Sequence, residues 1–351
     1  LTELLMKYDN PIPFQPFIGF ISQMLEISIK LASPPLDQLD EIMNALPLIG
    51  LFINNVESFS FEEIHPILTY TIENFVSRPD DDILSPDLIT ILHSIVSKIT
   101  SLIPSQEENQ QAQSIQFVLS ILQAVHPKCL EYLNKGDEDP MPCFKILYLY
   151  YSLFSLISNQ CAGSFAPTII DIISTIIPKL GELLGSSNDR ISNQAWEFAS
   201  DILRSFPDLF KGLLEPAVST VLSLEEHTEP GLLGNMALVF YDLCKLNIVN
   251  VSLLSEENFE HFIDVFSFPL EQDITFITHN YDEVDMLNIS LFILRLCAMT
   301  KLPISVTCYQ NAQTIVQTLD PSLTTLIEEV KQLVAEIEQA KSVKPDDSQL
   351  E

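Results

Sequence analysis

The chain has 351 residues, of which 48 are acidic and 17 basic, so its formal net charge at pH 7 is −31. This charge disfavours direct binding of nucleic acid and insertion at anionic membranes, because affinity for both comes largely from lysine and arginine. Hydrophobic residues make up 47% of the chain, which argues against a disordered protein. With 9 glycines and 22 prolines, the composition favours helices that end or bend at prolines.

Apolar residues three or four positions apart run through most of the chain, and alternating strand patterns are nearly absent. The spacing predicts about seven antiparallel helix pairs that repeat every roughly 40–55 residues. In chain order, the predicted pairs are 17–32 with 36–56, 61–76 with 85–103, 107–125 with 142–161, 165–184 with 188–206, 207–224 with 231–246, 256–268 with 281–299, and 304–319 with 321–340. Each pair has more apolar surface than it can bury alone, so neighbouring pairs must stack.

The sequence therefore predicts an all-α solenoid over residues 1–340 rather than separate globular domains. The last predicted helix has a polar outer face, as expected for the end of such a stack, and residues 341–351 are polar and expected to be disordered. The chain begins at Leu1 without a methionine, and we expect it to be the C-terminal part of a longer protein.

The fourth predicted pair carries the most informative motif, in residues 176–184 and 188–195. It resembles a HEAT repeat, in which a proline bends the first helix and a β-branched and a small residue open the buried face of the second. Pro178, Ile191 and Ala195 match these positions. HEAT repeats commonly have an arginine where this chain has Ser192, so the aspartate–arginine ladder of phosphatase-type scaffolds is not evident.

The irregular repeat length, the acidity and the acidic connections are similar to those of the karyopherin-β family of nuclear import and export receptors. The resemblance implies a right-handed superhelix that carries basic protein or peptide cargo on an acidic concave face, without a cofactor. It also implies contacts with the GTPase Ran and with Phe-Gly nucleoporins, in cytoplasm and nucleus. The alternative is a non-catalytic HEAT scaffold or regulatory subunit of a phosphatase, coat-adaptor or chromosome-organising complex.

The first group of candidate binding residues lies on the predicted helix 188–206 and includes Trp196, the one tryptophan of the sequence. At about 100° per residue, Trp196 falls on the flank of the apolar face of its helix. It is predicted either to pack against the neighbouring repeat or to contact a partner. Glu197 and Asp201 lie farther round the same helix, where a basic side chain of a cargo would meet them.

The acidic connections between helices are the second group of candidates. They are predicted either to be solvated loops or to contact lysine- and arginine-rich cargo. Because exposed ion pairs are individually weak, a binding patch needs several of them acting together. The residues are Asp80, Asp81, Asp82, Asp137, Glu138, Asp139, Glu225 and Glu226.

Catalysis is not predicted from any motif of the sequence. The chain has no phosphate-binding glycine loop, no nucleophile elbow and no HExxH zinc motif, and its six histidines are scattered. Its six cysteines show no CxxC spacing and are expected to be buried thiols in a reducing compartment. We therefore expect a protein that is not an enzyme and that has no catalytic, cofactor-binding or metal-binding residues.

Overall fold

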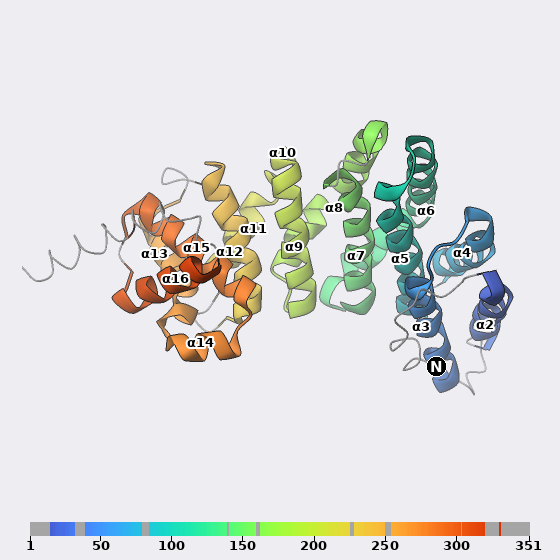
Figure 1. Cartoon of the computed structure of the whole chain (residues 1–351), viewed down its shortest axis with the longest axis horizontal. Coiled ribbons are helices and arrows are strands. Elements are labelled where there is room, and N and C mark those ends of the chain that lie inside the picture. The colour runs from blue at the N-terminus through green and yellow to red at the C-terminus, as the bar shows by residue number, and fades with distance from the viewer. Residues whose placement is uncertain are drawn as a thin grey trace, which may run out of the picture. The chain divides into compact units, whose positions relative to one another are not determined.

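The computed structural model describes residues 15–31, 39–78, 84–138, 140–158, 162–224, 228–249, 254–302, 304–319 and 330. Every element of regular secondary structure in these ranges is a helix (Figure 1). The helices form two compact units, one of residues 1–179 with 186–194 and one of residues 180–185 with 195–351. The division falls within α8 (Ala166–Leu184) and α9 (Asp189–Ser205), the helices of the fourth predicted pair.

The first unit has two layers of helices. The second helices of the first three predicted pairs form one layer: α3 (Leu39–Asn55), α5 (Ser85–Leu102) and α7 (Pro140–Ser158). The first helices form the other layer: α2 (Ile18–Leu31), α4 (Phe61–Ser77) and α6 (Glu108–Lys135). Because α5 contacts both α3 and α7, and α4 contacts both α2 and α6, each pair stacks on the next one.

The second unit repeats this layering with more irregular elements. Its described helices after α9 are α10 (Pro207–Phe210), α11 (Leu214–Leu222), α12 (Pro230–Lys245), α13 (Glu256–Ser267), α14 (Ile274–Asn280), α15 (Glu283–Thr300) and α16 (Val306–Leu319). The long α12 and α15 pack on each other, α11 contacts α13, and α16 packs on α15. The predicted class, an all-α helical-repeat fold of the solenoid type, is confirmed, whereas the right-handed sense of a superhelix stays a prediction.

The HEAT-like features of the fourth pair lie where the motif predicts them. Pro178 is inside α8, and Ile191 and Ala195 are fully buried on α9. Interior prolines also occur at Pro47 in α3 and Pro66 in α4. Each removes one backbone hydrogen bond, and the helices continue because their apolar faces are held by neighbours.

Two predicted helices differ from the observed ones. The helix expected to end at residue 125 continues as α6 to Lys135, because Tyr132 and Leu133 extend its buried face. The helix expected over 207–224 is divided into α10 and α11, with Phe210 and Leu213 both buried at the break. The helix expected over 321–340 lies outside the described residues apart from Val330, which is buried.

A chain of hydrogen bonds joins α6, α7 and α8 in the first unit. The His126 ring is within hydrogen-bond distance of Tyr150 through Nδ1 and of Thr175 Oγ1, 3.1 Å away, through Nε2. Because the Thr175 hydroxyl donates to the carbonyl of Ile172 at 2.6 Å, it accepts from His126 Nε2–H. A neutral histidine fits this arrangement, and burial lowers the pKa of His126.

The segment Ser85–Ser105, which contains α5, is long and apolar enough to cross a membrane, with a mean hydropathy of 1.4. It is the one such segment among the described residues. Helix α5 packs between α3 and α7, and its side chains Leu88, Leu92 and Ile95 are fully buried there. A core helix of a stacked repeat has the same length and composition as a membrane span, and these contacts account for the apolar character of α5.

Candidate protein-binding surface

Trp196 lies in the core of the second unit, which corrects its assignment as a partner-binding residue. Its side chain is fully buried, and its indole Nε1–H donates to the carbonyl oxygen of Leu184 at 3.1 Å. Its ring packs beside that of Phe240 on α12, with the ring centroids 6.1 Å apart. Of the two predicted roles, packing against a neighbouring helix therefore applies to Trp196, because α12 covers the side of α9 on which Trp196 lies.

The other helical candidates stay at the surface of α9. Glu197 is exposed and belongs to an acidic group that is described below. Asp201, one turn farther along, is half-buried and is not part of that group. Their assignment to partner binding therefore stays a prediction.

The acidic connections fall largely on residues whose placement is not described. Asp80, Asp81, Asp82, Asp139, Glu225 and Glu226 lie outside the described residues, as does the side chain of Asp137. Glu138 is described and exposed, at the end of the short helix Gly136–Glu138. Their predicted roles are therefore untested.

Three carboxylates of the second unit lie near enough to Asp285, on the first turn of α15, to act on it electrostatically: Glu197 on α9, Glu229 before α12 and Asp282 before α15. We call these three residues and Asp285 the acidic cluster. Glu229 is the residue that precedes α12, and Asp282 caps α15 by accepting the backbone N–H groups of Val284 and Asp285. Carboxylates are favoured there because the N-terminus of a helix is electropositive. Local helix chemistry therefore explains where two of the four residues lie.

Two glycines on α12 bring Asp285 into the cluster. A Cβ atom at Gly234 would lie 2.7 Å from Cβ and 2.8 Å from Cα of Asp285, whereas a Cβ at Gly231 would lie 3.6 Å from Asp285 Oδ2. The first turn of α15 thus packs directly on the backbone of α12, a closeness that only glycine permits at position 234. As a result the Asp285 carboxyl group is half-buried between two helices.

The electrostatic environment of Asp285 is strongly negative. Burial and repulsion from Asp282, Glu197 and Glu229 raise the pKa of Asp285 from its ordinary value of 3.8 to about 6. At neutral pH its ionised form is therefore held at a cost in free energy. A positive charge placed beside the cluster relieves this repulsion, so the site is suited to a cationic group.

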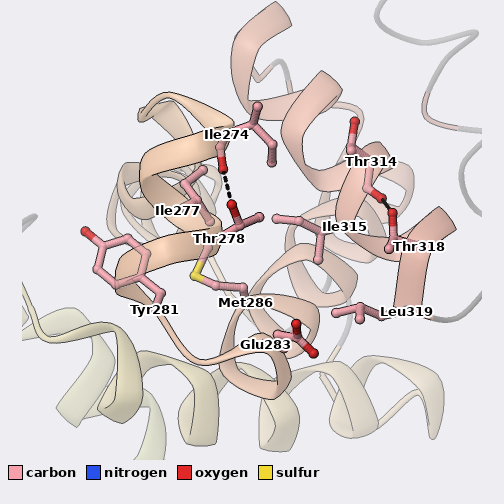
Figure 2. Close-up of a pocket in the computed structure, with 10 residues that line it drawn as sticks. All are labelled: Ile274, Ile277, Thr278, Tyr281, Glu283, Met286, Thr314, Ile315, Thr318 and Leu319. Carbon is pink, nitrogen blue, oxygen red and sulfur yellow. Dashed lines mark hydrogen bonds between the residues drawn. The ribbon is translucent and has the colours of Figure 1, made fainter.

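An apolar pocket lies beside the same end of α15, between α14, α15 and α16 (Figure 2). It has a volume of about 100 Å³ and is lined by Ile274, Ile277, Thr278, Tyr281, Glu283, Met286, Thr314, Ile315, Thr318 and Leu319. The hydroxyls of Thr278, Thr314 and Thr318 donate to carbonyl groups of their own helices. The hydroxyl groups of these threonines therefore have hydrogen-bond acceptors within the protein and need none from a ligand.

Large apolar side chains are exposed at Leu319, which lines this pocket, and at Phe276 and Val284, which precede and follow the lining residues Ile277 and Glu283 in sequence. Val284 is 63% exposed, Phe276 47% and Leu319 38%. Phe276 packs edge-on against Tyr281, with the ring centroids 5.8 Å apart. Exposed apolar groups gathered beside a concavity are typical of a protein-interaction surface.

Among the described residues, the cysteines are buried, and no group of side chains is arranged to bind a metal ion. Cys129, Cys143, Cys244, Cys297 and Cys308 are buried free thiols, as predicted, and Cys161 lies outside the described residues. Burial raises the pKa of Cys244 and of Cys297 to about 12, so both stay protonated at neutral pH. In the described part of the chain, no three histidine, cysteine, aspartate or glutamate residues are arranged to hold a metal ion.

Comparison with known proteins leaves the chain without a family assignment. No protein-family model and no curated protein matches it. Among solved structures, the crystal structure of an engineered protein from a structural genomics consortium is similar at a TM-score of 0.40 and 11% sequence identity. That similarity covers 99% of this chain and 84% of the other. A likeness of this size carries no argument about function, which must come from the surface of the molecule.

Proposed function

We propose that this chain is a non-catalytic protein-binding repeat protein that holds a lysine- or arginine-rich segment of a partner against the acidic cluster. The observation that carries the proposal is the environment of Asp285. Burial and three neighbouring carboxylates together raise the pKa of this residue. Like charges gathered at one place are costly until a cation joins them, so a basic segment gains affinity there. The net charge of −31 draws such partners from a distance.

The strength expected from charge alone is modest. An exposed ion pair is worth about 0.2–1 kcal/mol, so four such pairs supply at most about 4 kcal/mol. A dissociation constant of 1 μM corresponds to about 8 kcal/mol. The acidic cluster therefore explains orientation and fast, salt-sensitive association, and a stable complex needs apolar contacts as well.

We place this binding function in a nuclear transport receptor of the karyopherin-β type, with basic cargo, Ran and Phe-Gly nucleoporins as partners in cytoplasm and nucleus. The stacked helix pairs and the acidity support this proposal. The rival is a static scaffold whose partners stay docked. Immobilised Ran separates the two: a receptor binds one nucleotide state of Ran in preference to the other, whereas a scaffold of the second kind binds neither.

The binding proposal is tested with a fluorescent arginine- and lysine-rich peptide and the full chain in low salt. The variant Asp282→Asn, Glu283→Gln, Asp285→Asn removes three charges from the first turn of α15. The matched control Glu107→Gln, Glu108→Gln, Glu260→Gln removes three exposed charges elsewhere. We expect the first variant to bind at least about tenfold more weakly and the control to bind nearly as wild type. Equal affinity of the two variants would contradict the proposed site.

A further inference from the structure

We propose that the apolar pocket between α14, α15 and α16 is an anchor site for one branched aliphatic side chain of the same basic partner segment. This inference rests on the proposed function and adds to it the apolar part of the ligand. The partner class is then a segment that combines lysine or arginine with a leucine-like residue. Binding to the acidic cluster by charge alone would not require a leucine-like residue in the partner.

The walls of the pocket select an apolar group. Ile277, Met286 and Ile315 form its buried part, and the threonine hydroxyls on its sides are already bonded to backbone carbonyls. A polar side chain placed against this buried part would lose its hydrogen bonds to water without replacement, because Glu283, the one charged residue of the lining, is exposed to solvent. A methyl-bearing side chain would instead leave water for a surface that offers dispersion contacts.

The size of the pocket narrows the choice further. Its volume of about 100 Å³ is smaller than the ~150 Å³ cavity that holds a benzene molecule in a protein core. An aliphatic side chain of four carbons fits this space more readily than a phenyl ring. Burial of a leucine side chain is expected to strengthen binding by roughly ten- to a hundredfold.

One turn of α15 joins the pocket to the acidic cluster. Glu283 lines the pocket, and Figure 2 shows its carboxylate between Met286 and Leu319. Asp282 and Asp285, on the same turn, belong to the acidic cluster. Val284 lies between these acids and is 63% exposed. A ligand whose apolar side chain enters the pocket therefore has carboxylates within reach of the residues beside it.

Charge decides between a foreign partner and this protein itself as the occupant. In residues 320–351, which follow α16 directly, acidic residues outnumber basic ones. A second copy of the chain brings a net charge of −31. Both would place negative charge beside Glu283, Asp282 and Asp285, whereas a basic segment places positive charge there. The charge of the rim therefore favours a basic partner.

The test uses short peptides of lysine, arginine, glycine and serine in which one leucine is moved through every position, each compared with its alanine counterpart. Binding to the full chain is measured by fluorescence anisotropy. We expect the best leucine peptide to bind at least about tenfold more tightly than its alanine counterpart. Thr314→Leu fills the pocket and is expected to abolish the difference, whereas Thr307→Leu, at an exposed position of α16 away from the pocket, is expected to keep it.

A measurement on the unaltered protein guards against misfolding of the pocket variant. Methyl NMR of Ile277 and Ile315 is expected to show shifts with the leucine peptide that the alanine peptide does not cause. Equal binding of leucine and alanine peptides, with no such methyl shifts, would refute the pocket as an anchor and leave the acidic cluster standing. Failure of every basic peptide to bind at low salt would instead refute the proposed function, and the anchor with it.

Discussion

Asp285 gives the sharpest prediction, because its carboxyl group is half-buried and surrounded by like charges. Its pKa in the folded protein is about 6, above the 3.8 of an ordinary aspartate. Between pH 3.8 and about pH 6, Asp285 is therefore largely protonated in the folded state and largely ionised in the unfolded state. It follows that ionisation of Asp285 lowers stability as pH rises through this window, and that the cost is complete above about pH 6.

The magnitude follows from the pKa difference of about two, which corresponds to about 3 kcal/mol for a fully shielded group. Because Asp285 is half-exposed, screening by solvent reduces this to roughly 1 kcal/mol. We expect Asp285→Asn to raise the free energy of unfolding by that amount at pH 8, and by less at pH 5, where the wild-type carboxyl group is already largely protonated. Both pH values lie above the sequence pI of about 4.3.

The assay is urea unfolding followed by the fluorescence of Trp196, which is buried in the same unit as Asp285. Asp282→Asn is the control for the origin of the effect, since asparagine keeps the helix cap and removes one like charge. It should lower the pKa of Asp285 only in part, because burial is the largest cause of the shift. An Asp285 pKa near 3.8 by NMR, with equal stabilisation by Asp285→Asn at pH 5 and pH 8, would refute this reasoning.

Three further predictions concern the packing of the helices. Gly234→Ala should destabilise the second unit by about 2 kcal/mol, because the new methyl group meets backbone, whereas Gly231→Ala should change the urea midpoint little; equal effects would contradict the close approach. Trp196→Phe should lower stability by about 2 kcal/mol through a lost buried hydrogen bond, and an unchanged midpoint by circular dichroism would argue against that bond. Tyr150→Phe should cost about 1–2 kcal/mol by leaving His126 Nδ1 unpaired, which a thermal melt would detect.

The sequence predicted the helix pairs well because their signal is local. Apolar residues three or four positions apart define a buried face wherever the chain folds back on itself, and the layers of both units follow from it. The errors occurred where distant contacts override local rules. Pro127 does not end α6, since Tyr132 and Leu133 beyond it are held in the core, and α10 is separated from α11 by a break at which two apolar residues are buried.

The candidate site was predicted only in part, because its members come from separate helices. Glu197 was named from its helix, but Glu229 and Asp285 come near it only because α9 packs on α12 at Trp196 and Phe240 and α12 packs on α15. The signal present in the sequence was Gly234, since a glycine inside an apolar helix indicates a close approach by another element. Which element approaches it cannot be read from spacing along one helix. The burial of Trp196 could not be predicted for the same reason, because it depends on a contact with α12.

The central claim is that a basic partner segment lies against the acidic cluster, and calorimetry at pH 6 tests it most directly. An arginine-rich peptide is titrated into the full chain in two buffers of different ionisation enthalpy, which gives the number of protons exchanged on binding. A cation beside Asp285 lowers its pKa, so we predict release of up to about half a proton, and no release from Asp285→Asn. Binding with identical proton exchange in wild type and variant would contradict the claim.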